Sequence, residues 1–528
     1  MQKDRGTLLY SATDLVNFLE CEHLSSLDLE NLETPLERTA DSEEAALFQN
    51  KGNAHELAYL GRLKSRYEAV TDIKAESRPD PGVPVSDRSA KFDAAVQATV
   101  AAMQGGAEII YQAALRQGQF IGHADFLRRV PGNSKLGNYH YEVIDTKLAR
   151  SAKAKFLIQL CFYSDLPADT QGTLPAMTHV VLGDSSERSF RVADYSHYYA
   201  TAKARFLAFV HEGGSSTYPD PKERCDTCQW RGLCEARRLA DDHLCQVANI
   251  RKLQIRRLSD AGLGTLSGLG AAPAGIKVPN MVAETFDRLR NQARLQAKKK
   301  ETGKDYVETL PEAVGAGLGF DRLPPPSPGD LFFDMEGDPL EEGGLEYLFG
   351  VSWVEGSALK FRPFWAHTRA EERKAFEAFM DFVSARLKAD PDLHIYHYAA
   401  YENSALKRLM SLHGTREAEV DNLLRQDRLV DLYRVVREAV RVSEPAYSIK
   451  NLETFYLGPR TGEVQNAGAS IVYYERWKAL QEPGILEKIQ DYNEYDCRST
   501  FELRKWLIGL RPPLEHPLAE ALGAEDIP

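Results

Sequence analysis

Several features are missing from this sequence, and each absence narrows what the chain can be. No run of about 18 apolar residues is present, so we expect no membrane span. The opening MQKDRGTLLYSATDL has no apolar signal core, from which we expect a cytoplasmic protein. The pattern G-x-x-x-x-G-K-[ST] is also absent, so we do not expect an ATP-driven helicase. There is no internal repeat and no long low-complexity tract.

The chain is long for one domain and acidic overall. Its 528 residues predict two or three domains. The formal net charge of −12 argues against a wholly basic coat around nucleic acid. A basic path on one face remains compatible with this charge, because carboxylate-rich metal sites themselves make a protein acidic.

Residues 120–164 carry polar side chains on predicted strands. FIGHADFLRRV predicts a strand with Asp125, and YHYEVIDTKLA predicts a second strand that ends at Asp145-Thr146-Lys147. The segment PGNSKLGN between them suits a hairpin turn. Carboxylates hold Mg²⁺ through oxygen, the cation activates water and neutralises phosphate, and a lysine beside it can stabilise charge. This set indicates phosphodiester hydrolysis.

Two predicted helices could complete the site. Residues 153–164 have helical spacing, which places Gln159 and Tyr163 at i and i+4 on one face. A helix predicted over Glu43–Arg66 carries His55, which could ligate a metal through a neutral ring nitrogen. Taken singly, each of these residues is more simply a surface, core or capping group. Their order along the chain favours a nuclease.

The patterns G-x-x-D at 122–125, D-x-K at 145–147 and Q-x-x-x-Y at 159–163 resemble those of the RecB-like branch of the PD-(D/E)xK nucleases. The resemblance implies a restriction-endonuclease-like core that uses Mg²⁺ or Mn²⁺. The metal ligands that it implies are His55, Asp125 and Asp145, and the catalytic residues are Lys147, Gln159 and Tyr163.

Seven cysteines are present, and three of them form C-x2-C-x5-C at Cys225, Cys228 and Cys234. Cys21 lies far upstream. In a reducing compartment such a set indicates metal binding rather than disulfides. Thiolates suit zinc or an iron–sulfur cluster, and spacing alone does not choose between them. A redox pair at Cys225 and Cys228 is a third alternative.

Iron–sulfur members of the same nuclease branch have one cysteine before the nuclease core and three after it, and this chain is similar. The resemblance implies a 4Fe-4S cluster that joins the first and last parts of the domain, with zinc as the rival. Cys161, Cys245 and Cys497 are interpreted as ordinary buried thiols.

Residues 241–322 are interpreted as a helical, basic connector. LSDAGLGTLSGLG is similar to a helix–hairpin–helix, whose turn amides can hold a phosphate, although simple helical packing explains it equally well. Between Arg251 and Lys304, twelve Lys and Arg stand against four acids. This surplus favours a phosphate backbone over a merely solvated helix face. The candidate nucleic-acid-binding residues are Arg288, Arg290 and Arg294.

A second set of carboxylates follows the Pro-rich linker LPPPSPGD, residues 323–330. LFFDMEGDP predicts a strand that ends in Asp334-x-Glu336, and IYHYAAYENSALKRL predicts a strand, a turn and a helix with Glu402 at the junction. A late helix carries Tyr492 and Asp496 at i and i+4. Such a set suits a two-metal exonuclease, in which Asp334 bridges both cations and Tyr492 orients water.

This second pattern resembles the DnaQ-like, DEDD-type branch of the RNase H fold, most closely the RNase H-like domain found after RecB-like nucleases. One motif departs from that family, because Tyr401-Glu402 stands where Phe-Asp is usual. The longer glutamate would move the metal, so a purely structural domain that docks nucleic acid is the alternative. Asp431 is either a supporting acid or a helix N-cap. The implied metal ligands are Asp334, Glu336, Glu402 and Asp496.

The sequence therefore predicts an α/β multidomain protein. The expected parts are a nuclease with a four-cysteine cluster at 1–240, the connector at 241–322, and an RNase H-like 3′–5′ exonuclease-type domain at 328–528. The expected function is a metal-dependent nuclease with two active sites, acting on DNA ends or single strands in repair, recombination or defence. The alternatives are a nucleic-acid-binding platform with an inert second domain that recruits a separate helicase, and an RNA-processing exonuclease.

Overall fold

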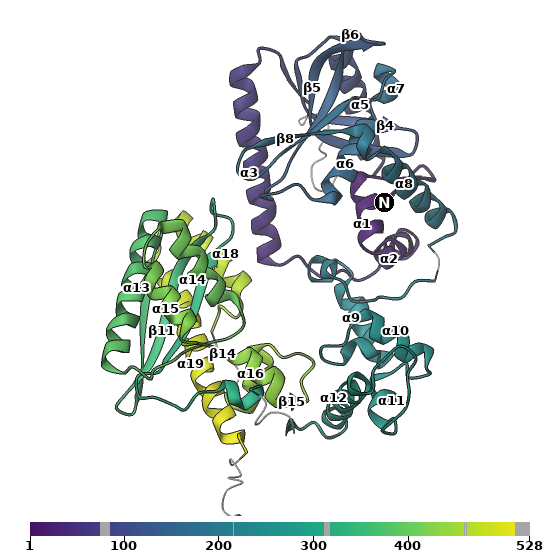
Figure 1. The fold of residues 1–528 in the computed structure, drawn as a ribbon. Coiled ribbons are helices and arrows are strands. Elements are labelled where there is room, and N and C mark those ends of the chain that lie inside the picture. The colour runs from purple at the N-terminus through teal and green to yellow at the C-terminus, as the bar shows by residue number, and fades with distance from the viewer. Residues whose placement is uncertain (74–84, 215, 311–316, 459, 461, 513–528) are drawn as a thin grey trace, which may run out of the picture. The chain divides into compact units, whose positions relative to one another are not determined.

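The computed structural model describes all residues except 74–84, 215, 311–316, 459, 461 and 513–528 (Figure 1). The chain divides into two compact units, Met1–Arg237 and Arg238–Pro528. Each unit has a mixed α/β architecture with its own sheet. Among the described helices, none combines the length and the apolar character needed to cross a membrane.

The first unit is built on a six-stranded sheet with the order β3-β4-β5-β6-β7-β8. The central strands β4, β5 and β6 pair antiparallel, whereas β6 and β7 pair parallel. The strands of this unit are β1 (Gln2–Asp4), β2 (Thr7–Leu9), β3 (Val70–Asp72), β4 (Ile109–Gln117), β5 (Phe120–Ser134), β6 (Gly137–Thr146), β7 (Met177–Val181) and β8 (Glu187–Arg191).

Helices cover both faces of this sheet. Along β4, Ile109 faces one core and Ile110 the other, as expected for alternating side chains. The first core includes Tyr59 and Leu63 of α3 (Glu43–Arg66), and α1, α5, α6 and α8 enclose the second. The other helices of this unit are α1 (Ala12–Glu20), α2 (Glu22–Glu33), α5 (Val85–Gln104), α6 (Ala154–Asp165), α7 (Ala168–Gln171), η1 (Val192–Asp194), α8 (Ser196–His211), η2 (Glu223–Thr227) and α9 (Arg231–Ala240).

Most predicted elements of the first unit are confirmed. Ser11 caps α1, and α3 has the expected bounds. The hairpin turn is shorter than predicted, because β5 and β6 resume pairing at Ser134 and Gly137 after an irregularity. Ser134 Oγ closes the turn by accepting a hydrogen bond from Leu136 N at 2.9 Å.

Residues 70–72 form β3, which pairs parallel with β4, and α5 begins at Val85.

The second unit has a five-stranded sheet with the order β12-β11-β10-β13-β14. The central strand β10 pairs antiparallel with β11 and parallel with β13. Its position places any side chain of β10 in the middle of the unit. The strands are β10 (Leu331–Asp338), β11 (Leu345–Glu355), β12 (Ala358–Trp365), β13 (Ile395–His397) and β14 (Leu429–Asp431).

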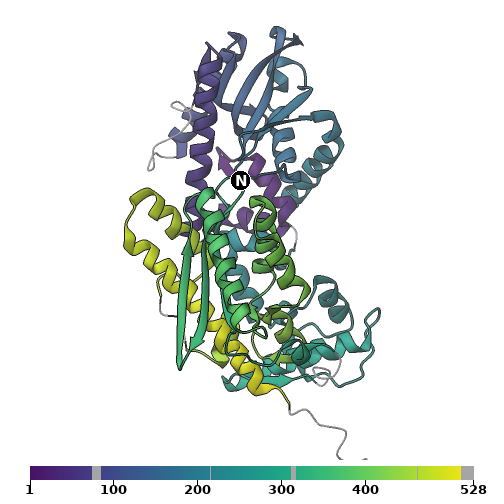
Figure 2. The ribbon, with the colours of Figure 1, turned by 60° about the vertical axis from the view of Figure 1, so that its left-hand side comes forward.

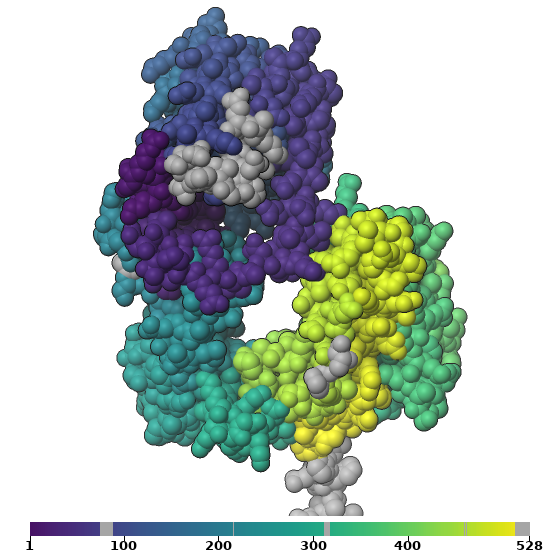
Figure 3. All heavy atoms as spheres, turned by 180° about the vertical axis from the view of Figure 1, so that it is seen from behind, coloured from purple at the N-terminus to yellow at the C-terminus, as the bar shows by residue number. Residues whose placement is uncertain are grey.

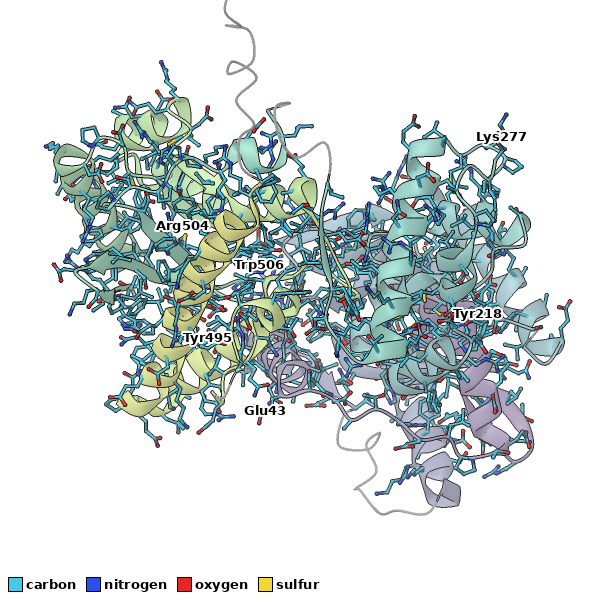
Figure 4. The ribbon with its side chains drawn as sticks, turned by 90° about the horizontal axis from the view of Figure 1, so that it is seen from below. Glu43, Tyr218, Lys277, Tyr495, Arg504 and Trp506 are labelled. Carbon is cyan, nitrogen blue, oxygen red and sulfur yellow. The ribbon has the colours of Figure 1, made fainter. Side chains whose placement is uncertain are left out.

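Two sets of helices sandwich this sheet (Figures 1 and 2). Leu331 and Phe333 of β10 pack under α13, α14 and α15, whereas Phe332 faces α16 and α19. Tyr495, Arg504 and Trp506 mark the course of α19 in Figure 4. The helices are α13 (Arg369–Ala389), α14 (Tyr401–His413), α15 (Glu417–Arg425), α16 (Leu432–Ala439), α17 (Ile449–Leu452), η6 (Glu453–Phe455), α18 (Ala467–Leu480) and α19 (Pro483–Leu510).

The predicted connector has a small apolar core and is joined to the rest of the second unit. The segment LSDAGLGTLSGLG joins two helices, α10 and α11, as expected. They pack on α12 through residues such as Leu258, Leu269 and Leu289. β9 pairs antiparallel with β15, and Gln292 Nε2 donates to Val442 O at 2.9 Å. The elements are η3 (Leu244–Gln246), α10 (Lys252–Asp260), α11 (Leu266–Ala271), α12 (Ala283–Thr302), β9 (Val307–Thr309), η5 (Gly319–Arg322) and β15 (Val440–Val442).

Candidate active sites

Three of the predicted carboxylates of the second unit gather at one point. Asp334 and Glu336 alternate with the apolar residues of β10 that face α13, so both project toward the α19 side of the sheet. Asp496 lies on α19. One oxygen from each of the three lies within 4.8 Å of the others. The central strand and the long last helix thus build an acidic centre.

A buried amide fixes one oxygen of Asp334. Asn493, one turn before Asp496 on α19, donates from Nδ2 to Asp334 Oδ2 at 2.7 Å. A β-carbon on Gly350 of β11 would lie 1.6 Å from Asn493 Oδ1, so only glycine leaves room for this amide. Asn493 is fully buried. The other oxygen of Asp334 is left for a ligand.

The burial of these acids indicates that a bound cation balances their charge. Burial and the charge of Asp496 raise the pKa of Glu336 to about 8. Burial, with the charges of Asp496 and Glu336, also raises the pKa of Asp334. Because buried charges in proteins are paired or bind metals, this donor set fits a divalent cation such as Mg²⁺ or Mn²⁺.

Glu402 lies near the three clustered acids but is not one of the group. It is the second residue of α14 and is buried, and its charge contributes to the raised pKa of Asp334. Its Oε2 lies 3.4 Å from His397 Nδ1 and has no hydrogen-bond partner among the described residues. The glutamate that replaces the expected aspartate therefore acts on Asp334 through its charge but lies outside the group of three acids within 4.8 Å.

Tyr492 and Asp496 face the same site one turn apart on α19. Burial raises the pKa of Asp496, and the Tyr492 hydroxyl acts in the opposite direction. Burial and the charges of Asp496 and Glu336 raise the pKa of Tyr492, so the phenol stays protonated and can donate.

Two cations that we did not predict border the acidic centre. Arg460 Nη2 pairs with Asp496 Oδ1 at 2.6 Å and also bonds Glu453. Lys450 lies with Nζ 5.5 Å from the centre of the Tyr492 ring. Burial lowers the pKa of Lys450, while the charge of Asp496 acts in the opposite direction. Both cations could meet a substrate phosphate.

Asp431 is an N-cap, one of its two predicted roles. Its Oδ1 accepts from Tyr433 N of α16 at 2.9 Å, and from Ala399 N at the same distance. Ala399 has φ +70° in the turn before α14. Asp431 therefore also stabilises the turn that positions Glu402.

A second acidic group in this unit already holds a cation. Asp338, Glu341 and Glu475 come close enough to bind a metal. However, Lys478 Nζ lies 3.0, 2.6 and 2.5 Å from their oxygens. The lysine ammonium neutralises this group, so we do not regard it as a metal site.

The first unit brings its predicted acids together across the β5–β6 hairpin. Asp125 and Asp145 each lie one residue beyond the Phe126–Ile144 pair, so they face each other. Asp125 Oδ2 accepts from the backbone and hydroxyl of Thr146, both at 2.8 Å. Burial and the charge of Asp145 raise the pKa of Asp125 to about 7.

Lys147, Gln159 and Tyr163 surround these acids. Lys147 Nζ lies 2.6 Å from Asp145 Oδ2. Gln159 hydrogen-bonds Tyr163, and burial with the charge of Asp145 raises the pKa of Tyr163. A β-carbon on Gly122 would lie 2.6 Å from the Tyr163 ring, which explains the glycine of the G-x-x-D pattern.

Helix α3 contributes Glu56, which we did not predict, as well as His55. Glu56 Oε1 accepts from Tyr111 Oη at 2.6 Å and from Gln112 Nε2 at 2.7 Å. Its charge helps to raise the pKa of Asp125. His55 Nε2 lies 3.4 Å from Val181 O, at the strand that pairs with the end of β6. In the described part of this unit, no three potential ligand atoms gather within 4.8 Å.

The four cysteines of the predicted cluster lie where the ends of the first unit meet. Cys21 joins α1 to α2, Cys225 lies in η2, Cys228 follows it, and Cys234 lies in α9. All four are half-buried. The charges of Cys21 and Cys225 are close enough to raise the pKa of Cys228, to which burial contributes most.

The segment after α8 is held against α2. Trp230 Nε1 donates to Asp28 Oδ1 at 2.8 Å. Two backbone amides, Lys222 N and Trp230 N, donate to Cys225 Sγ and Cys228 Sγ, each at 3.4 Å. Amide donors of this kind stabilise thiolates in metal sites.

The three arginines predicted to bind nucleic acid differ in their surroundings on α12. Arg290 Nη1 donates to Ala272 O at 3.3 Å, and Arg294 Nη2 pairs with Glu308 Oε1 at 2.6 Å. Burial and the nearby charges of other arginines lower the pKa of Arg288. Arg288 is thus the best placed of the three to meet an anion from outside.

Without added divalent cation, the protein is expected to lose stability as the pH rises from about 5 to about 8. Glu336 has an ordinary pKa of 4.5 when unfolded and about 8 when folded, so the fold favours its protonated form. That contribution is complete below the unfolded value and is lost as the pH rises through the folded value. Thermal unfolding at about pH 5.5 and about pH 8 measures the effect, and Mn²⁺ should stabilise more at the higher pH.

Glu336→Gln is the control for this pH dependence and should flatten it in part. Asp125, with a pKa of about 7, accounts for part of the remaining pH dependence, which Asp125→Asn should remove. A wild-type midpoint that rises over this range would contradict the assignment.

Two of the residues that sequence reasoning missed share one signal. Asn493 and Glu56 are polar positions within the buried stripes of long helices, next to predicted site residues. Glu56 precedes Tyr59, Leu60 and Leu63 by three, four and seven positions. A polar residue on such a stripe indicates a site beneath it.

Comparison with known proteins covers part of the second unit. No match was found among curated proteins. A sequence model of the RNase H superfamily matches residues 331–508, which include all five strands of the sheet and the clustered acids. The second unit therefore contains an RNase H-like domain, which indicates chemistry related to nucleic acids.

Proposed function

We propose that this protein is a metal-dependent nuclease with two active sites, one in each unit, acting on DNA ends or single-stranded DNA. The observation that carries the proposal is the cluster of Asp334, Glu336 and Asp496, one half-buried and two buried carboxylates within 4.8 Å in a domain similar to RNase H. Repulsion between buried acids is expensive unless a cation balances it. Such a centre suits hydrolysis better than passive docking.

Each residue of the second site has a role in this proposal. Asp334, Glu336, Glu402 and Asp496 would hold divalent cations, which activate water and neutralise the phosphate. Asn493 keeps the Asp334 carboxylate in one orientation. Tyr492, whose pKa is raised, keeps its proton and orients the attacking water.

The first site would follow the RecB-like PD-(D/E)xK plan. Asp125 and Asp145, with His55 or Glu56 from α3, are its proposed metal ligands. Lys147 would stabilise charge on the scissile phosphate. Gln159 and Tyr163, which hydrogen-bond each other beside Asp145, would orient the substrate.

The decisive experiment is a hydrolysis assay of the anaerobically purified protein. Labelled single-stranded DNA, duplex DNA and RNA of one sequence are incubated with Mg²⁺, with Mn²⁺ and without divalent cation. We expect cleavage that needs the cation and is fastest on single-stranded DNA. Cleavage of RNA alone would favour RNA processing. Binding without any cleavage would favour a platform that recruits a helicase.

We further propose that Cys21, Cys225, Cys228 and Cys234 hold a 4Fe-4S cluster, with zinc as the rival. The amide donors to Cys225 and Cys228 support a thiolate site, and the contact of Trp230 with Asp28 supports a role in joining the ends of the unit.

Cys228→Ser is expected to remove the metal and to lower the midpoint of thermal unfolding of the first unit, because metal binding contributes folding free energy. Absorption spectra and iron and zinc analysis under anaerobic conditions measure the loss. Cys245→Ser, outside the set, should keep the metal. Colourless wild-type protein with one zinc and no iron would exclude the iron–sulfur cluster.

A further inference from the structure

Three arginines from distant parts of the sequence meet on one face of the second unit. Arg251 begins α10, Arg288 lies on α12, and Arg437 lies on α16. The charges of Arg437 and Arg251 help burial to lower the pKa of Arg288. Like charges repel, so a cluster of this kind indicates an anion that binds from outside.

Hydrogen bonds and a ring contact hold together the segments that carry these arginines. Arg437 Nη1 donates to Asn249 Oδ1 at 2.5 Å, two residues before Arg251. The guanidinium of Arg437 also lies 5.6 Å from the Tyr447 ring. Tyr447 Oη donates to Gln292 Oε1 at 2.8 Å, and Gln292 lies one turn after Arg288 on α12.

The acids near the arginine cluster are engaged elsewhere. Glu308 pairs with Arg294 and Arg441, and Glu438 pairs with Arg322. In the ranges that the structure describes, Arg251, Arg288 and Arg437 form no ion pair with a carboxylate. The three guanidinium groups are partly exposed and keep donors for a ligand.

A short segment connects the arginine cluster to the RNase H-like site. Two residues lie between Tyr447, beneath Arg437, and Lys450, beside Tyr492, and that length of chain spans at most about 10 Å. Tyr398 Oη also donates to Tyr447 O, which joins this segment to the turn before Glu402. In Figure 3 the yellow-green segment that follows α16 lies against the yellow helix α19.

We propose that Arg251, Arg288 and Arg437 bind the phosphodiester backbone of the strand that the RNase H-like site cleaves. That the bound strand is also the strand that is cleaved rests on the proposed function of the RNase H-like site. Arginine suits the role because its planar fork contacts phosphate oxygens in pairs. Contacts of this kind position the strand but do not distinguish one base from another.

Binding is measured on the full chain with Asp145→Asn and Asp334→Asn, so that no substrate is cleaved. Fluorescence anisotropy with labelled oligothymidylate follows the dissociation constant across a range of salt concentrations. The added triple variant Arg251→Gln/Arg288→Gln/Arg437→Gln should weaken binding by about tenfold or more. It should flatten the logarithmic salt slope by about 2, since each single-strand phosphate contributes about 0.7.

A control with the same change in net charge is Arg362→Gln/Arg373→Gln/Arg425→Gln, on β12, α13 and α15. It should leave the salt slope unchanged. An unchanged slope in the test variant, or equal flattening in both, overturns the proposal. An unchanged slope combined with lost binding of an acidic peptide would assign the cluster to a protein partner instead.

A small chromogenic diester separates this proposal from the proposed function. Bis(p-nitrophenyl) phosphate has a single phosphodiester group, so when that group lies at the acidic centre no further phosphate is left for the arginine cluster. With both active sites intact, the triple arginine variant should hydrolyse it at the wild-type rate. No hydrolysis by the wild-type protein would count against the proposed function, while the anisotropy result would still decide the role of the arginines.

Discussion

Asp334→Asn is expected to reduce hydrolysis by the RNase H-like site by about 10³-fold, because this carboxylate would be one of the ligands that hold the divalent cation. The first site is silenced by Asp145→Asn, so that only the second site is measured. The asparagine keeps the shape of the side chain, and its amide oxygen still accepts from Asn493. Rates on single-stranded DNA with saturating Mn²⁺ give the effect.

The unfolding midpoint of the same variant shows whether it still folds. Removing one of the mutually repelling buried acids should raise the unfolding midpoint without divalent cation, and Mn²⁺ should no longer stabilise it. Glu355→Gln, an exposed acid at the end of β11, is the matched control and should change neither rate nor stability. Wild-type hydrolysis by Asp334→Asn would remove the assignment of this centre as a nuclease site.

Lys147→Met is expected to reduce hydrolysis by the first site by about 10²–10³-fold and to leave DNA binding nearly unchanged. The lysine would stabilise charge that develops only in the transition state, so its loss lowers the rate rather than the affinity. Methionine fills the volume of the buried side chain. Asp334→Asn silences the second site, and rates and dissociation constants are measured together.

Lys155→Met on α6 is the matched control, since this lysine is exposed and pairs with Glu20 at 2.8 Å. Circular dichroism checks folding, because Lys147→Met leaves Asp145 without its closest cation. Unchanged hydrolysis in the Lys147 variant would show that the hairpin acids are structural. Equal losses in both lysine variants would mean that general charge, not the site, is being measured.

Local pattern predicted much of both units. The alternation in residues 120–146 predicted the β5–β6 hairpin, and helical spacing predicted α3, α6 and the pair Tyr492 and Asp496 on α19. Clustering of the acids followed from their places at strand and helix positions that share one face. The catalytic roles of these residues remain predictions.

Features that depend on distant contacts could not be predicted in this way. The amide of Asn493 fits only because Gly350, far earlier in the chain, has no side chain. Arg437 acts together with Arg251 and Arg288 only in the folded chain, because the three residues are far apart in the sequence. The three-residue strands β9 and β15 are too short to give a periodic signal.

The pairing of β9 with β15 limits how the RNase H-like domain can be isolated. Its sequence match begins at residue 331, whereas Val440–Val442 pair with residues 307–309. Tyr306 and Ser443 extend this pairing, because Ser443 N donates to Tyr306 O and Tyr306 N donates to Ser443 Oγ, both at 2.9 Å. A fragment that begins at residue 331 would expose an unpaired edge, which promotes aggregation. Fragments for crystallisation should therefore begin near residue 241, and insolubility of a shorter one would say nothing about catalytic competence.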